Sequence, residues 1–133
     1  MTSRVGSIRA RVFLVSLVSL LFLLSLVFPA SAHHSTAEFD LTRPATVSGV
    51  VTRFEWANPH SHIYLDATAP DGTLEHWVIE IDSPHGLERM GWSKDKLKPG
   101  DKITCSGARA KNGSPKMRCT QVILADGALL QSQ

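Results

Sequence analysis

The chain lacks the features that mark several large classes of protein. It has only two cysteines among 133 residues, no Cys-x-x-Cys motif, and 14 Lys+Arg that nearly balance 12 Asp+Glu. No repeat with a period of about 20 to 50 residues is present, which argues against a solenoid. No motif pairs a nucleophile with a base, so nothing in the sequence indicates an enzyme. A charged content of 20% beside 43% hydrophobic residues argues against disorder, and the length allows about one domain.

Residues 1–32 have the pattern of a secretory signal peptide. They contain three arginines and no acid, then an apolar run from Val12 to Phe28, and they end in Ala30-Ser31-Ala32. This pattern predicts export to the periplasm or the medium and cleavage after Ala32, which leaves no stable membrane anchor. The alternative is a retained anchor, because about 17 apolar residues lie at the lower limit for crossing a bilayer. The Ala-x-Ala ending favours cleavage.

Removal of the signal changes the balance of charge. The mature chain would have 101 residues and keep 11 of the 14 basic side chains and all 12 acids, so its formal charge falls to about −1. Export and near-neutral charge together argue against nucleic acid as a partner, because binding to phosphates needs clustered Lys and Arg. All six histidines stay in the mature part and become its main compositional feature.

The two cysteines, Cys105 and Cys119, lie in strand-like runs that a turn-rich segment joins. In an oxidising compartment two cysteines of a small domain usually pair, so we expect a disulfide. A bridge that closes this short loop would stabilise the fold by on the order of 3 kcal/mol. A redox-active or metal-binding pair is the alternative, and the missing Cys-x-x-Cys motif argues against it.

The rest of the chain predicts a small, mainly β domain. Residues 33–45 are polar and read as an extended N-terminal arm, and residues 46–133 form the domain, in which Gly49 marks a bulge or a sharp bend. A short helix, capped by Ser83 and ended by Gly91, lies between the third and fourth of five strand-like runs: Thr46–Trp56, His62–Thr68, Leu74–Asp82, Asp101–Ala108 and Met117–Leu124. This order predicts an OB-fold-like five-stranded barrel with one short helix between strands 3 and 4. A β-sandwich that does not close is the alternative.

Alternation places histidines and carboxylates on one face of the second and third strands. A three-residue hairpin loop, Pro70-Asp71-Gly72, sets Leu65 opposite Trp77 on the core face. The same register sets three pairs on the other face: His62 with Glu80, Asp66 with His76, and His60 near Asp82. These are either exposed cross-strand pairs worth roughly a few tenths of a kcal/mol each, or parts of a binding face.

The predicted new N-terminus gives the histidines a second grouping. Cleavage after Ala32 would make His33 the first residue, so its α-amine and imidazole could chelate one metal ion with His34 beside them. His60 and His62 form a His-x-His pair that points to one side of a strand. Nitrogen ligands of this kind favour copper among the divalent ions. Cleavage one residue earlier would put His34 third, which is also a copper(II)-binding arrangement; the alternative is a polar arm with no metal.

Two functions therefore stay open. The first is an exported protein that binds copper or a similar ion through four histidines: His33, His34, His60 and His62. The second is a metal-free OB-like module that recognises a small ligand, a glycan or a partner protein. Its binding residues would be Trp56, Tyr64, His76 and Glu80.

Short motifs run along almost the whole mature chain. They are Ala32-His33-His34-Ser35, Glu38-Phe39-Asp40, Gly49-Val50-Val51, Trp56-Ala57-Asn58-Pro59-His60, Trp77, Ser83-Pro84, Gly91-Trp92, Leu97-Lys98-Pro99-Gly100-Asp101 and Asp126-Gly127. With this set the chain resembles the exported bacterial proteins known as domain of unknown function 6152. The resemblance implies a small, secreted, periplasmic β-domain and implies no activity.

Overall fold

The computed structural model describes residues 14–15 and 36–133. Leu14 and Val15 are helical and belong to a unit that spans Met1–His33, and the β-domain belongs to a second unit, His34–Gln133. No helix within the described residues has the length and apolarity needed to cross a bilayer. The proposed cleavage site and the two histidines that follow it lie outside the described residues.

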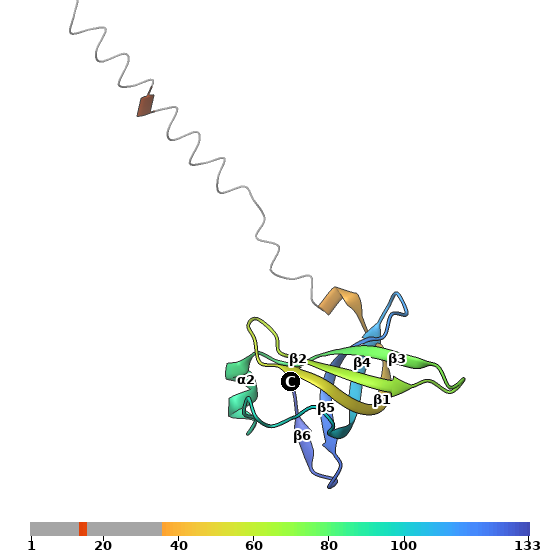
Figure 1. The fold of residues 1–133 in the computed structure, drawn as a ribbon. Coiled ribbons are helices and arrows are strands. Elements are labelled where there is room, and N and C mark those ends of the chain that lie inside the picture. Colours follow the sequence, from red (N-terminus) through yellow and green to blue (C-terminus); the bar gives the residue numbers. More distant parts are fainter. Residues whose placement is uncertain (1–13, 16–35) are drawn as a thin grey trace, which may run out of the picture. The chain divides into compact units, whose positions relative to one another are not determined.

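The domain is built almost entirely of strands (Figure 1). Its elements are η1 (Thr36–Glu38), β1 (Phe39–Glu55), β2 (His62–Thr68), β3 (Leu74–Glu80), α2 (Pro84–Arg89), β4 (Lys102–Ala110), β5 (Lys116–Leu124) and β6 (Leu129–Gln131). The sheet order is β3-β2-β1-β4-β5-β6, and an additional parallel pairing joins β3 to β5. Five strands therefore form a closed ring, with the helix between the third and the fourth. The mainly β, OB-like fold expected from the sequence is confirmed.

The parallel β3–β5 pairing closes the ring, and its short length accounts for the sixth strand, which the sequence pattern did not predict. The first residues of β5 pair with β3, and Val78 donates a backbone hydrogen bond to the carbonyl oxygen of Pro115, 3.0 Å away. Further along, β5 turns its free edge to β6, which pairs with Gln121, Val122 and Ile123. The strand β6 thus covers a sheet edge that the short parallel pairing leaves open.

The first strand begins at Phe39, seven residues before the expected Thr46. Phe39 is 1% exposed and packs in a small cluster with Ala108 and Ala110, so burial of one ring draws the chain onto the edge of β4. Most of the segment expected as an extended arm is therefore strand. The sequence pattern hid this, because residues 40–43, three polar residues and the exposed Leu41, bulge out of the β1–β4 ladder between Phe39 and Pro44.

Alternation along β2 and β3 fills the inside of the ring. The observed register pairs His62 with Glu80, Leu65 with Trp77 and Asp66 with His76, as expected from the hairpin loop. The core contains the inward side chains of these strands together with Leu87 from α2 and Trp92 after it. The helix is capped as expected: Ser83 Oγ accepts a hydrogen bond from the Gly86 backbone N–H at 3.2 Å, and Gly91 follows with φ +85°.

Gly49 serves close packing between strands. A Cβ atom at this position would collide with the carbonyl oxygen of Asp66, so only glycine allows β1 and β2 to approach this closely. The register irregularity expected at Gly49 lies instead between Val51 and Arg53. The sequence pattern therefore predicted the irregularity slightly too early in β1.

Cys105 and Cys119 are both fully buried and are free thiols, so the expected disulfide is not present in this structure. They lie on the neighbouring strands β4 and β5, on either side of a register irregularity between Ser106 and Gly107. A hydrogen bond from the Cys105 thiol to Cys119, reinforced by burial, raises the pKa of Cys105 far above its ordinary value. The strands therefore bring the two cysteines into contact, as the pairing argument required, but without a bond.

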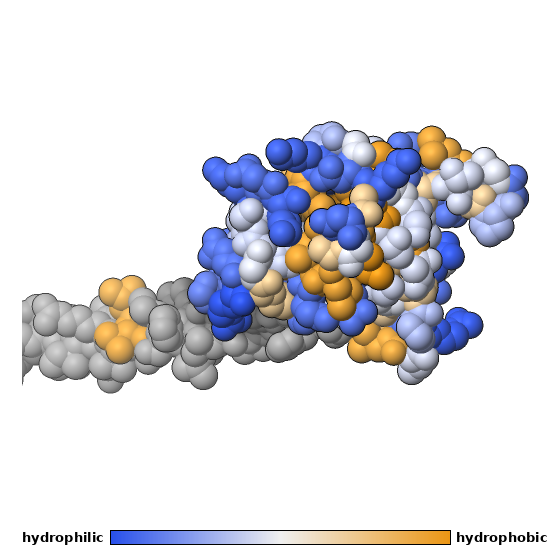
Figure 2. All heavy atoms as spheres, turned by 90° about the horizontal axis from the view of Figure 1, so that it is seen from below, coloured by the Kyte–Doolittle hydropathy of each residue, from blue (hydrophilic) through white to orange (hydrophobic). Residues whose placement is uncertain are grey.

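Hydrophobic residues also reach the surface, in the middle of the face seen in Figure 2, with hydrophilic residues beside them. Within the β-domain the large exposed apolar side chains are Leu41, Val50, Leu74, Ile123 and Leu129. Single exposed apolar side chains are ordinary on a small domain, because there is too little polar surface to cover it. We assign no role to them.

Candidate functional site

The candidate site lies on the outer face of β1, β2 and β3. Because inward and outward side chains alternate, the register places five polar or aromatic residues together: Arg53, Glu55, His62, Tyr64 and Glu80. We call this set the histidine face. Two of its members, His62 and Tyr64, lie next to β1 residues, with His62 paired to Glu55 and Tyr64 paired to Arg53.

The β1 side of the histidine face is tightly ordered. The Tyr64 hydroxyl donates a hydrogen bond to Glu55 Oε2 at 2.9 Å, and the Arg53 guanidinium carbon lies 3.9 Å from the centre of the Tyr64 ring. Arg53 Nη2 is also 3.5 Å from Glu55 Oε2. The hydrogen bond to Glu55 raises the pKa of the Tyr64 hydroxyl above its ordinary value. These contacts hold an aromatic ring, a cation and an anion in one arrangement.

His62 occupies the centre of the face between two carboxylates. Its strand partners are Glu55 on β1 and Glu80 on β3. Burial lowers the pKa of His62 below its ordinary value, and the charges of Glu80 and Glu55 oppose that effect. The neutral imidazole, which is the form that binds metal ions, is therefore favoured near neutral pH.

His60 precedes β2 and follows a cis peptide bond between Asn58 and Pro59. Its Nδ1 atom is buried and has no hydrogen-bond partner among the described residues. The expected neighbour Asp82 is occupied elsewhere: its Oδ1 accepts a hydrogen bond from the Ser83 backbone N–H at 2.6 Å, at the start of α2. The strand pairing does continue past His62: the Ser61 N–H donates to the Asp82 carbonyl oxygen at 3.1 Å, and the Ser61 carbonyl oxygen accepts from the Ile81 N–H at 3.0 Å.

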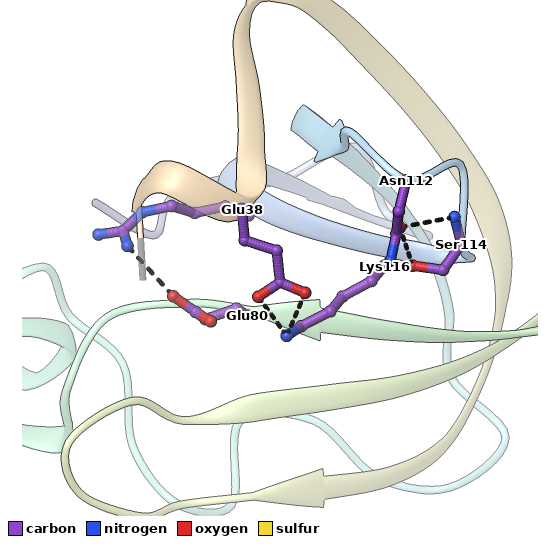
Figure 3. A network of polar contacts seen from close by, with 6 residues as sticks. Glu38, Glu80, Asn112, Ser114 and Lys116 are labelled. Atoms are coloured by element: carbon purple, nitrogen blue, oxygen red, sulfur yellow. Dashed lines mark hydrogen bonds and ion pairs between the residues drawn. The ribbon is translucent and has the colours of Figure 1, made fainter. Parts of the chain in front are cut away.

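Two ion pairs lie where β3 meets β5 and border the histidine face (Figure 3). Arg118 Nη1 is 3.1 Å from Glu80 Oε1, and Lys116 Nζ is 2.8 Å from Glu38 Oε2. Glu80 is 6% exposed, so its charge depends on the guanidinium beside it. Glu38 belongs to η1, and its ion pair fixes the start of the described chain next to the histidine face. The charge of Lys116 acts on His62 and contributes to its lowered pKa.

The remaining residues expected to bind a ligand lie apart from this group. Trp56 packs edge-on against Phe54, with ring centres 5.7 Å apart, and contributes to the core rather than to the face that carries Tyr64. His76 Nδ1 lies 2.6 Å from Asp66 Oδ1, but the His76 side chain is 76% exposed. This pair is an exposed cross-strand contact near the hairpin loop, and such pairs contribute little to stability.

Of the four expected metal ligands, the structure describes His60 and His62; His33 and His34 lie outside the described residues. Within residues 14–15 and 36–133, no group of three His, Cys, Asp or Glu side chains is arranged to hold a metal ion. The described residues therefore show no metal site by themselves.

Sequence reasoning missed four charged members of this region: Arg53, Glu55, Lys116 and Arg118. Simple alternation could not find Arg53 and Glu55, because the irregularity between Val51 and Arg53 is what turns them to the outer face. Lys116 and Arg118 were missed because they reach the site through the parallel β3–β5 pairing, which joins segments far apart in sequence.

Comparison with known proteins gives one result. A family model described as a family of unknown function (DUF6152) matches residues 20–118. No curated protein matches the chain. The matched range includes both pairs of histidines and the whole histidine face.

Proposed function

This chain belongs to the DUF6152 family of unknown function, and we propose a function from its own residues. We propose that the protein is exported to the bacterial periplasm and binds copper or a similar transition-metal ion. The ligands are the nitrogens of His33, His34 and His62, with His60 beside them. The observation that carries the proposal is the Glu38–Lys116 ion pair, which holds Glu38, four residues after His34 in the sequence, beside the histidine face.

Export supplies the first ligands. The basic start, the apolar run and the Ala30-Ser31-Ala32 ending support cleavage after Ala32. Cleavage there frees the α-amine of His33 and sets it next to the imidazole of the same residue. An amine and an imidazole on one residue chelate a single ion, and nitrogen donors favour copper among divalent ions.

The path of the chain supports a meeting of these nitrogens with His62. Phe39 is buried against β4, and Glu38 is bound to Lys116, so both residues are held on the ring. His34 is two residues before Thr36 in the sequence, and two residues span at most about 7 Å. The charge of Lys116 acts on His62, so the lysine that binds Glu38 also lies close enough to influence His62.

The environment of His62 suits a metal ligand. Partial burial lowers its pKa, so fewer protons compete with a metal ion at neutral pH. Glu55 and Glu80 lie beside it and offset the charge of a bound cation.

Copper(II) titration of protein that begins at His33 tests the proposal. Substituting His62→Ala, and separately His33→Ala, should each weaken binding by at least about tenfold, because each removes an imidazole ligand. His76→Ala is the matched control: it removes an exposed histidine of the same sheet and should leave the affinity unchanged. Equal affinity in all four proteins would contradict the proposal. The electron paramagnetic resonance spectrum should change in the first two variants and not in the control.

The ordered Tyr64–Arg53–Glu55 group favours a second candidate, a metal-free module that recognises a ligand or partner protein on the same face. Aromatic and arginine side chains held in place are typical of recognition surfaces. Under this alternative, wild-type protein takes up no copper, and a His60→Ala and His62→Ala double variant loses the partner instead.

The proposed export also bears on the cysteines. In an oxidising compartment the two contacting thiols of Cys105 and Cys119 would each lose a proton and together give two electrons to a thiol–disulfide oxidoreductase, which forms their disulfide and reduces that of the oxidant. This disulfide would link β4 covalently to β5.

A further inference from the structure

A pocket of about 650 Å³ lies between the start of β1 and the end of β4. We call it the β1–β4 pocket; the lining residues that matter here are Asp40, Arg43, Ala45, Arg109, Lys111 and Gly113. None of them belongs to the histidine face or to the proposed metal ligands. Its volume is in the range of sites that hold small molecules, about 300 to 1,000 Å³.

The bulge in β1 shapes one wall of this pocket. Pairing of β1 with β4 passes from Phe39–Ala110 directly to Pro44–Ala108, so residues 40–43 leave the ladder opposite Arg109. Asp40 holds the bulge together, because its carboxylate accepts hydrogen bonds from the Thr42 N–H at 3.1 Å and the Thr42 hydroxyl at 2.6 Å. The wall is thus fixed by contacts inside the bulge.

Arg109 forms the opposite wall and is held in place on two sides. It aligns with the core residue Met117, its guanidinium carbon lies 4.8 Å from the centre of the Trp77 ring, and Nη2 donates to the Gly113 carbonyl oxygen at 3.1 Å. Its Nε is buried and has no partner among the described residues. A guanidinium fixed in this way retains N–H donors for a ligand, and a planar fork of such donors matches the oxygens of an anion.

The charges in the pocket favour an anion. Arg43, Arg109 and Lys111 bring three positive charges against the single carboxylate of Asp40. That carboxylate is already engaged, because it also accepts a hydrogen bond from Arg43 Nε at 3.0 Å, and the Thr42 and Arg43 contacts lower its pKa to about 2. Lys111 and Arg109 are therefore left as the cations without a carboxylate partner in the pocket.

We propose that the β1–β4 pocket binds a small organic oxyanion, with a carboxylate or phosphate group held by Arg109 and Lys111. The apolar wall formed by Ala45 and Pro44 takes the organic part of the ligand. The site is independent of the proposed metal ligands, so this protein would carry two separate binding functions.

Nuclear magnetic resonance titration of the whole protein in metal-free buffer tests this proposal, with succinate and inorganic phosphate as probes. Saturable shifts are expected at Arg109 Nε–H and at the backbone amides of residues 110–113. Lys111→Gln, an exposed change with no effect expected on folding, should weaken binding several-fold, and Arg109→Lys should weaken it by about tenfold because it keeps the charge and loses the fork.

The matched control is Arg89→Gln, which removes an exposed arginine of α2 outside the pocket and should leave binding unchanged. Saturation by succinate alone, or by phosphate alone, would identify the anion class. Absence of saturable shifts with both probes, or wild-type affinity in both Lys111→Gln and Arg109→Lys, would overturn the proposal. His62→Ala should bind both probes as wild type does, so failure here and failure of the metal proposal are distinguishable.

Discussion

The inner and outer faces of the same strands follow different physical rules. Along β2 and β3, inward residues such as Ile63 and Ile79 are fully buried and belong to the hydrophobic core. Outward residues meet charged partners: the Tyr64 hydroxyl donates to Glu55 at 2.9 Å, and His62 pairs across the strands with Glu55 and Glu80. Core packing needs only apolar side chains of the right volume, whereas the hydrogen bonds and ion pairs of the outer face need particular residues. The inner face therefore sets the fold, and the outer face is where binding can be gained or lost without unfolding.

The largest effect expected is on the inner face. Ile79→Ala should lower the free energy of unfolding by about 2 to 5 kcal/mol, because it removes apolar contact and leaves a cavity inside the ring. Leu74→Ala is the matched control on the same strand: its side chain is 56% exposed, and the change should cost less than about 0.5 kcal/mol. Chemical denaturation of both variants checks the difference. Similar losses would show that the ring interior is not the source of stability.

The cysteine pair adds a covalent test of the inner face. Protein exported into an oxidising compartment should be lighter by two hydrogen atoms than protein kept reduced, and reduction should lower its stability by on the order of 3 kcal/mol. A Cys105→Ala and Cys119→Ala double variant should lose this dependence on redox state. Intact mass with alkylation after unfolding reads out both forms; two free thiols in the exported protein would contradict the expectation.

On the outer face, the effect should depend on burial. Arg118→Ala leaves the Glu80 carboxylate buried beside an apolar gap and should destabilise the protein by about 2 kcal/mol. Lys116→Ala breaks the more exposed pair with Glu38 and should cost less than about 1 kcal/mol. Removing both charges of the more buried pair, in the double variant Glu80→Gln with Arg118→Met, should recover part of the stability that Arg118→Ala loses. Equal costs for Arg118→Ala and Lys116→Ala would remove the distinction between the two pairs.

The smallest effect expected is on the titration of Tyr64, which is the only tyrosine of the chain. Its hydroxyl should ionise above its ordinary pKa of 10.0, and Glu55→Gln should bring the pKa down toward that value, because the hydrogen bond to a charged carboxylate is lost. A raised pKa in the folded state stabilises the fold below pH 10.0 and ceases to do so as the pH rises through the folded value.

Ultraviolet absorbance of the tyrosinate follows this titration directly. Glu75→Gln is the control, because Glu75 accepts its hydrogen bond from the Trp77 ring nitrogen instead. A titration of Tyr64 that is the same in Glu55→Gln as in wild type would show that the outer-face contacts are not maintained in solution.

Local patterns sufficed for the inner face and for part of the outer face. Alternation and one hairpin loop predicted the β2–β3 register and the pairing of His62 with Glu80, because both depend on neighbours in sequence. The start of β1 was missed because one buried ring, Phe39, outweighs the three polar residues and one exposed leucine that follow it. The partners of Glu80 and Glu38 were missed because they arrive through the β3–β5 seam, which no local pattern reports.

Trp56 was expected on the candidate site and lies against the core instead. Its position at the end of β1 predicted a place beside Tyr64, but the irregularity between Val51 and Arg53 reverses the alternation of the strand end. Phe54 and Trp56 thereby point to the core, and Arg53 and Glu55 take the outer face. A single bulge therefore decides which residues of β1 belong to the candidate site.

Native mass spectrometry of the exported protein after exposure to copper tests the central claim most directly, since it reports the first residue and the bound metal in one experiment. The account predicts a chain that begins at His33 and retains one copper ion, and loss of that ion in His62→Ala but not in His76→Ala. A processed chain that retains no copper, or retains it equally in both variants, would contradict the account.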